Sequence, residues 1–159
     1  MLAGLLLGIP ILAAILIMVA PSRLAKWLGL AGALCTLGWG VVFACLYPYW
    51  GEIPAEGTEL AGYWPVDDGW AIVPLLGLEL RLGVNSVSLL LVLLTCLFAP
   101  MVVLASFTAI TERVKEFYVW LMIMNAAVIG VFIARDVITF YTAFEVSLIP
   151  AFFLVAIYG

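Results

Sequence analysis

Long apolar runs, separated by short polar stretches, make up most of this sequence. A bilayer core about 30 Å thick requires roughly 20 apolar residues at 1.5 Å of helix per residue. The runs that meet this requirement are Leu2–Ala20, Trp27–Tyr47, Val84–Ile110, Phe117–Ala134 and Val137–Tyr158. The first run has basic residues after it and none before it, so we expect a retained helix and not a cleaved signal peptide. The pattern predicts an all-α, polytopic membrane protein with five transmembrane helices.

The composition supports this fold class. Apolar residues make up 67% of the 159 residues and charged residues only 10%, and the mean hydropathy is +1.30. A soluble domain is about half apolar and about a quarter charged, so the composition excludes an ordinary globular enzyme. The chain also lacks the concentration of Lys and Arg that a nucleic-acid-binding protein needs.

The sequence offers few residues that could bind a metal ion or carry out redox chemistry. Histidine is absent, and the three cysteines form no C-x-x-C pair. Cys35 and Cys45 lie on one predicted helix about 15 Å apart, too far to share a metal ion. We expect these two and Cys96 to be small, buried, apolar residues, and we expect no metal or cofactor on this chain.

Basic residues in short loops predict the orientation in the membrane. The loops after the first and third runs carry four basic residues: Arg23, Lys26, Arg113 and Lys115. The loops on the other side of the membrane carry only two. The loops after the first and third runs are therefore expected in the cytoplasm or its equivalent, with the N-terminus on the periplasmic or intermembrane side. The acidic segment 48–82, rich in Gly and Pro, is expected to cover the outer surface as an irregular or short amphipathic loop.

One charged residue lies inside an apolar run. Fifteen of the sixteen charged residues stand between the runs, whereas Glu145 lies nine residues after Asp136, about 13 Å into its predicted helix. An acid near the bilayer centre costs roughly 2.5–3.5 kcal/mol, so the carboxyl must be protonated or paired with a cation. We interpret Glu145 as a proton or cation site. A structural hydrogen bond between helices is the alternative.

Three polar residues are candidate partners of Glu145. Tyr141 and Thr142 precede it by four and three residues and share its face of the helix. The last two runs are joined only by a short turn and should pack antiparallel, which brings Asn125 to nearly the same depth. We hypothesise that Asn125 and Glu145 approach each other across this helical hairpin.

Pro150 is a further feature of this helix. A proline frees the carbonyl four residues earlier, here that of Val146, beside Glu145. A kink at this point would admit water or a partner group. The apolar runs contain no Lys or Arg to neutralise Glu145, so a cation would come from a continuation of this chain or from another chain.

Two stretches resemble a known family. The motif F-Y-x-x-F-E-x-x-L-I-P in 140–150, with Y-G at 158–159, resembles the fifth-helix signature of the antiporter-like subunit M of respiratory complex I, whose mitochondrial counterpart is NADH dehydrogenase subunit 4. Residues 82–91 are similar to the family's G-V-D-G-I-S opening of the third helix. Here Asn85 and Ser86 replace the family's Asp and Gly.

The resemblance implies a proton-translocating membrane subunit of an NADH:quinone oxidoreductase. Such a subunit has about fourteen helices in two inverted five-helix repeats, and the family's fifth-helix acid, here Glu145, pairs with a lysine on the seventh helix. Residues 1–116 would form three N-terminal helices, and 117–159 would begin the first repeat. NADH, FMN, iron–sulfur clusters and quinone would be bound by other subunits, and partners would be other membrane-arm subunits and the lipid bilayer.

Two other classes remain open from the sequence. A cation/proton antiporter subunit or a membrane hydrogenase subunit uses closely related chains. A non-transporting five-helix scaffold or a truncated product is the other alternative, and the sequence is compatible with a fragment, a split gene or a complete subunit.

Overall fold

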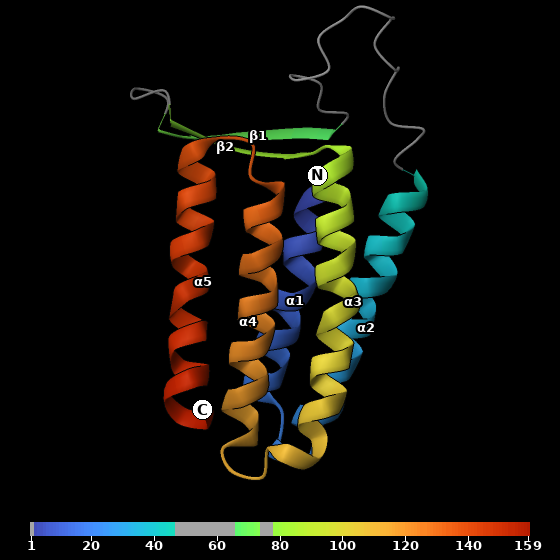
Figure 1. The fold of residues 1–159 in the computed structure, drawn as a ribbon, viewed down its shortest axis with the longest axis vertical. Coiled ribbons are helices and arrows are strands. Elements are labelled where there is room, and N and C mark those ends of the chain that lie inside the picture. The colour runs from blue at the N-terminus through green and yellow to red at the C-terminus, as the bar shows by residue number, and fades with distance from the viewer. Residues whose placement is uncertain (1, 47–65, 74–77) are drawn as a thin grey trace, which may run out of the picture.

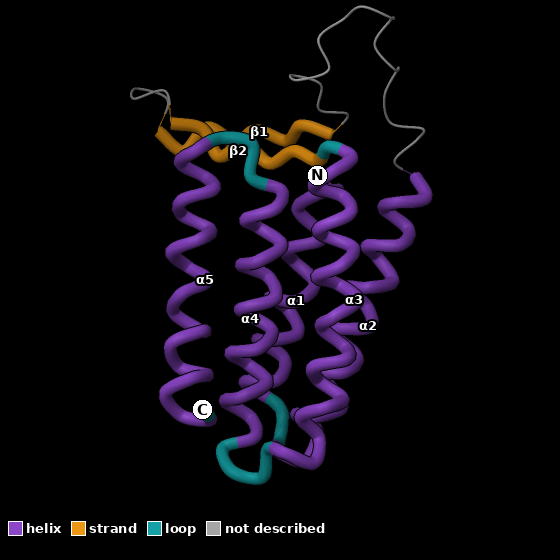
Figure 2. The backbone as a smooth tube through the Cα atoms, in the orientation of Figure 1, coloured by secondary structure: helices purple, strands orange, loops and turns teal. Residues whose placement is uncertain are grey.

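The computed structural model describes residues 2–46, 66–73 and 78–159. Within these residues it contains five helices and two strands: α1 (Leu2–Val19), α2 (Ser22–Leu46), β1 (Val66–Val73), β2 (Leu78–Val84), α3 (Ser86–Ala109), α4 (Val114–Ile133) and α5 (Val137–Tyr158). The helices stand side by side as an upright bundle, with the strands across one end (Figures 1 and 2). We call this the hairpin end, and the end at which α5 finishes the C-terminal end. The all-α membrane fold predicted from the sequence is confirmed, since α2 to α5 are each long and apolar enough to cross a membrane and α1 is a shorter apolar helix.

The helix bounds differ most from the prediction where basic residues lie. Helix α2 begins at Ser22 and not at Trp27, so Arg23 and Lys26 are helical. Long basic side chains allow this because the stem packs on apolar surface while the amine reaches polar groups at the membrane boundary. The Lys26 Nζ donates a hydrogen bond of 2.5 Å to the Phe107 carbonyl oxygen near the end of α3, which helps to satisfy the last carbonyls of that helix.

The two strands replace the irregular loop that was predicted for part of segment 48–82. They pair antiparallel, with Val66 opposite Val84 and Gly69 opposite Arg81, and Leu82 forms a further bridge to Ala134 in the α4–α5 turn. The prediction was wrong here because it gave the turn-forming residues more weight than the alternation of apolar and charged residues, Leu-Glu-Leu-Arg-Leu, over 78–82. Such an alternation is typical of a strand. The rest of the segment, 48–65 and 74–77, lies outside the described residues.

Helix α4 forms the centre of the bundle and α5 its edge (Figure 1). Half of the apolar window of α4 is buried, against 6% of that of α5. Small residues allow the closest helix contacts, because an ideal Cβ placed on Gly32 of α2 would lie 2.4 Å from the Ala13 Cβ of α1. Lipid tails are as apolar as the side chains, so such close packing is a main source of helix association in membranes.

Helices α4 and α5 pack antiparallel, as predicted. The Trp120 and Phe153 rings stack at 4.5 Å between centroids, and a Cβ on Gly130 would lie 3.4 Å from the Ala143 Cβ. At the C-terminal end the Tyr158 hydroxyl donates a 2.8 Å hydrogen bond to the Arg113 carbonyl oxygen. These contacts hold both ends of the helical hairpin in one register.

Candidate functional site

Glu145 lies on the side of α5 that no other described element covers. Only Thr139 and Pro150 of this helix are buried, and Glu145 itself is exposed. Helical spacing places it on one face with Tyr141, Leu148 and Phe152, whose exposed fractions are 61%, 47% and 68%. An isolated carboxylate therefore stands among apolar side chains on an uncovered helix face.

Of the two hydroxyls predicted near Glu145, one interacts with it. The Tyr141 hydroxyl is close enough to the Glu145 carboxyl for an electrostatic interaction. The Thr142 Oγ1 instead donates to the Ile138 carbonyl oxygen at 2.8 Å, and its side chain lines a cavity of about 230 Å³ between α1, α4 and α5. The described contacts of Glu145 therefore come from its own helix.

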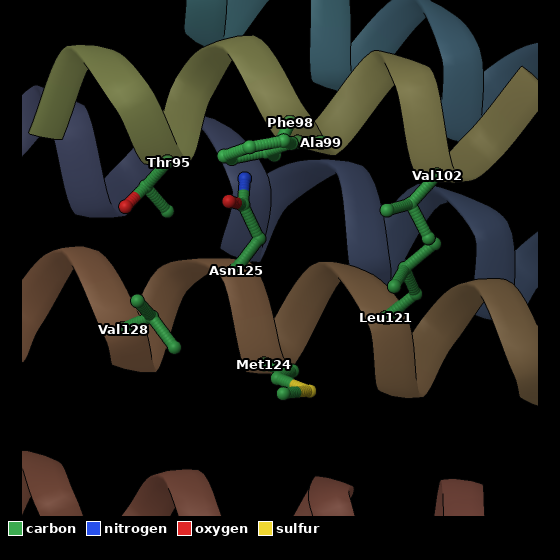
Figure 3. A pocket seen from close by; sticks show the side chains of 8 residues that line it. All are labelled: Thr95, Phe98, Ala99, Val102, Leu121, Met124, Asn125 and Val128. Carbon is green, nitrogen blue, oxygen red and sulfur yellow. The ribbon is translucent and has the colours of Figure 1, made fainter.

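Asn125 does not pair with Glu145, which corrects the hypothesis drawn from the sequence. Its side chain is 7% exposed and points from α4 toward α3, away from α5 (Figure 3). Its Nδ2 donates no hydrogen bond within the described residues. The α4–α5 contacts at Gly130–Ala143 and Trp120–Phe153 also place Asn125 level with Leu148, about one helical turn from Glu145.

Pro150 lies within a helix that runs unbroken from Val137 to Tyr158. Its ring is buried, so it belongs to the packed side of α5, whereas Glu145 belongs to the exposed side. The predicted proximity of the Val146 carbonyl to Glu145 follows from sequence position alone.

Basic side chains lie at the ends of the described helices. Arg113 pairs with Glu116 at 3.2 Å in the α3–α4 connection, Lys26 caps α3, and α5 contains no Lys or Arg at all. The cation that a deprotonated Glu145 needs is thus absent from its own helix. Among the described residues, no three His, Cys, Asp or Glu side chains gather into a possible metal site.

The start of α5 carries a polar contact that the sequence interpretation missed. Asp136 is the N-cap, and its carboxylate accepts hydrogen bonds from the Thr139 backbone N–H at 2.8 Å and from the Thr139 Oγ1 at 2.5 Å. An Asp before an apolar run is a recognised N-cap signal. The cap determines where α5 begins.

Asn85 has a similar role at the start of α3. Its side chain accepts a 2.7 Å hydrogen bond from the Ser88 backbone N–H, a contact that a neutral amide makes as well as a carboxylate does. The departure from the family's Asp therefore leaves the helix cap intact.

The cysteine prediction is wrong for two of the three residues. Cys96 is buried, but Cys35 and Cys45 are exposed. The buried face of α2 follows small residues, Gly29, Gly32 and Gly40 among them, and both exposed cysteines lie on the other side of the helix, where the bilayer would meet the bundle.

An apolar bundle whose helices are long enough to cross a bilayer defines the class: a multi-pass integral membrane protein. The chain is homologous to the N-terminal portion of subunit M and chain 4 of NADH-quinone oxidoreductases, as the two sequence motifs suggested. No family model matches it.

The relatives are much longer than this chain. It is 32% identical to F(420)H(2) dehydrogenase subunit M of Methanosarcina mazei, over 99% of this chain and 30% of the relative. It is 34% identical to NADH-quinone oxidoreductase subunit M of Rhodobacter capsulatus, over 88% of this chain and 25% of the relative. The chain therefore spans less than a third of the relatives that it matches.

Solved structures show the same fold. A chain of the Mrp complex from a Dietzia species aligns with a TM-score of 0.76 at 19% identity, over 100% of this chain and 16% of that chain. A chain of the archaeal membrane-bound sulfane sulfur reductase aligns with a TM-score of 0.70 at 18% identity, over 97% of this chain and 23% of that chain. At these identities the likeness establishes the arrangement of helices.

Proposed function

We propose that this chain forms the first helices of a proton-translocating subunit in a complex I-like quinone oxidoreductase. The observation that carries the proposal is the position of Glu145, a carboxylate on the uncovered apolar face of α5. Homology to subunit M and chain 4 supports the same assignment. The site also includes Tyr141, whose hydroxyl interacts electrostatically with the carboxylate.

The uncovered face calls for a further helix that carries a cation. A carboxylate exposed to lipid is strongly disfavoured, and intramembrane acids pair with bases or line proton pathways. The relatives are more than three times longer than this chain, which leaves room for additional helices. We therefore assign the missing partner to a lysine-bearing helix, supplied by a continuation of this chain or by another subunit, that packs on Glu145, Leu148 and Phe152.

The proton step follows from this pairing. When the lysine ammonium contacts Glu145, the negative charge stabilises its proton. When the helices shift and the contact is lost, the lysine binds its proton less tightly and releases it to the next acceptor. The nearby Tyr141 hydroxyl would donate to the Glu145 carboxylate while the lysine is away, so that the pair can form again.

Redox chemistry belongs to other subunits in this proposal. NADH or a comparable donor, FMN, iron–sulfur clusters and quinone would be bound elsewhere in the complex, and this chain would couple electron transfer to charge movement. The hairpin end would face the periplasm or the intermembrane space. Partners in the bilayer would be neighbouring membrane-arm subunits.

The test is Glu145→Gln in the complete complex. This substitution keeps the size of the side chain and removes its charge, so assembly should persist while coupled quinone-reductase activity falls sharply. Tyr141→Phe should produce a smaller loss, because the carboxylate remains and only the neighbouring hydroxyl is removed. Glu112→Gln, in the exposed α3–α4 connection, serves as the control and should behave like the wild type. Wild-type activity in the Glu145 variant would instead support a scaffold role.

A cation/proton antiporter or a respiratory complex with another electron donor is the second candidate. The structural likeness to the Mrp complex and to the sulfane sulfur reductase favours it, and one relative is named for F(420)H(2). Purified complex should be assayed for oxidation of NADH, F(420)H(2) and hydrogen, and for Na⁺ dependence. Turnover with NADH and quinone that does not depend on Na⁺ supports the first candidate.

A further inference from the structure

The start of α2 carries a patch of basic and aromatic side chains at the C-terminal end of the bundle. Arg23 precedes Lys26 by three residues and Trp27 by four, so the three share one side of the helix. The Lys26 Nζ donates its hydrogen bond of 2.5 Å to the Phe107 carbonyl oxygen. The Trp27 ring packs edge-on against the Phe107 ring, at 5.7 Å between centroids. We call Arg23, Lys26, Trp27 and Phe107 the Arg23 patch, and these two contacts hold it against α3.

The patch has positive charge that no described acidic side chain neutralises. Arg23 is exposed, and no hydrogen bond or ion pair joins its side chain to another described residue. After its bond to Phe107, the Lys26 ammonium still has two N–H groups to donate. Segments 20–26 and 110–116 together carry four basic and two acidic residues. This end of the bundle therefore attracts an anion.

Beyond Trp27 the exposed face of α2 is apolar. The Trp27 side chain is 64% exposed, and Leu34 and Val41, which follow it at intervals of seven residues on the same side of the helix, are 50% and 49% exposed. A Cβ added to Gly38, between them, would meet no atom within 4 Å. From the C-terminal end upward, the face thus presents a basic group, an aromatic ring and then apolar side chains, and no described element covers it.

We infer that this face binds an anionic phospholipid, with its phosphate on the Arg23 patch and an acyl chain along α2. The two classes of group meet where a lipid needs them, because basic side chains at the membrane boundary attract anionic headgroups and tryptophan rings lie at the headgroup level. The Arg23 guanidinium donates two parallel N–H groups to phosphate oxygens, and the Lys26 ammonium donates a third hydrogen bond.

The headgroup that fits carries no cation. A choline group would add a positive charge beside Arg23 and Lys26, whereas a glycerol headgroup leaves the phosphate as the only charge. The patch therefore selects phosphatidylglycerol or a similar anionic lipid over phosphatidylcholine. This site lies on α2 and is independent of the function proposed for Glu145.

The experiment is photocrosslinking in the complete complex, reconstituted in vesicles of equal parts phosphatidylglycerol and phosphatidylcholine. Ala31 is exposed one turn beyond Trp27, and Ala31→p-benzoylphenylalanine places a photoreactive group where the acyl chain should lie. The masses of the adducts identify the lipid. Val41→p-benzoylphenylalanine is the control, because Val41 is on the same face but about 27 Å along the helix from Arg23. Adducts at position 31 should be enriched several-fold in phosphatidylglycerol, and adducts at position 41 should follow the composition of the vesicle.

Two charge substitutions test the role of the patch at position 31. Arg23→Gln should reduce the enrichment to the composition of the vesicle, while Arg23→Lys should keep part of it. Arg113→Gln removes the same charge at the same end of the bundle, but from a side chain that pairs with Glu116 at 3.2 Å, and should leave the enrichment unchanged.

Three results would overturn the inference: equal lipid ratios at positions 31 and 41 in the otherwise wild-type complex, an equal effect of Arg113→Gln and Arg23→Gln, or crosslinking of position 31 to a protein subunit in place of lipid. If Arg23→Gln does not assemble, the comparison of positions 31 and 41 still decides.

Discussion

The contact between α1 and α2 gives a prediction that can be worked out from distances. A methyl group added in Gly32→Ala would lie 2.4 Å from the Ala13 Cβ, whereas Gly38 on the same helix has no atom within 4 Å of the added Cβ. The Ala13 Cβ has no rotamer that moves it aside. The two helices must therefore separate by about 1 Å to reach the shortest ordinary van der Waals distance of 3.4 Å.

The expected magnitude follows from comparing the two variants. Over-packing a close contact costs about 1–3 kcal/mol. Replacing Gly by Ala inside a helix also gains up to about 1 kcal/mol in helix propensity, but this gain is the same at Gly32 and Gly38. The difference between the variants isolates the steric cost, so Gly32→Ala should be about 1–3 kcal/mol less stable than Gly38→Ala.

The assay is unfolding of the detergent-solubilised protein, followed by circular dichroism during denaturant titration, for both variants and the wild type. Gly38→Ala should be at least as stable as the wild type. Equal stability of the two variants would refute the reasoning, because it would mean that α1 and α2 do not approach at Gly32 as described.

The remaining predictions concern the helix caps and the orientation. Asp136→Ala should lower the free energy of unfolding by about 0.5–2 kcal/mol. Asp136→Asn should keep most of the wild-type stability, because the amide oxygen still accepts a hydrogen bond from Thr139. Denaturant titration measures both changes. Asn85→Ala should cost a similar amount and Asn85→Asp almost nothing, by the same measurement. Thr111→Cys, between α3 and α4, should be made with Cys35, Cys45 and Cys96 replaced by Ala, because Cys35 and Cys45 are exposed. In that background it should react with an impermeant maleimide only from the cytoplasmic side; labelling from the outer side would reverse the proposed orientation.

The bounds of α5 could be predicted from the sequence, but the rotation of the helix about its own axis could not. The bounds Val137–Tyr158 agree with the structure because Asp136 and the apolar run mark them. The side chains of α5 are apolar on nearly every face of the helix, so the spacing of apolar residues does not indicate which face is packed. The direction of Glu145 and its separation from Asn125 became clear only from the tertiary contacts of Gly130 and Trp120.

Other differences have equally specific causes. Lys26 was assigned to a loop because charges usually end an apolar run, yet its amine reaches the Phe107 carbonyl from within α2. The motif around Glu145, by contrast, pointed to the correct homologues because it is long and specific.

The number of protons translocated per electron pair tests the central claim most directly. It should be measured with the purified complex in sealed vesicles for wild type, Glu145→Gln and the control Glu112→Gln, at matched rates of electron transfer. The account predicts a lower ratio for Glu145→Gln alone, since the carboxylate on α5 that is proposed to hold a partner lysine is lost. An unchanged ratio in an assembled Glu145→Gln complex would contradict it.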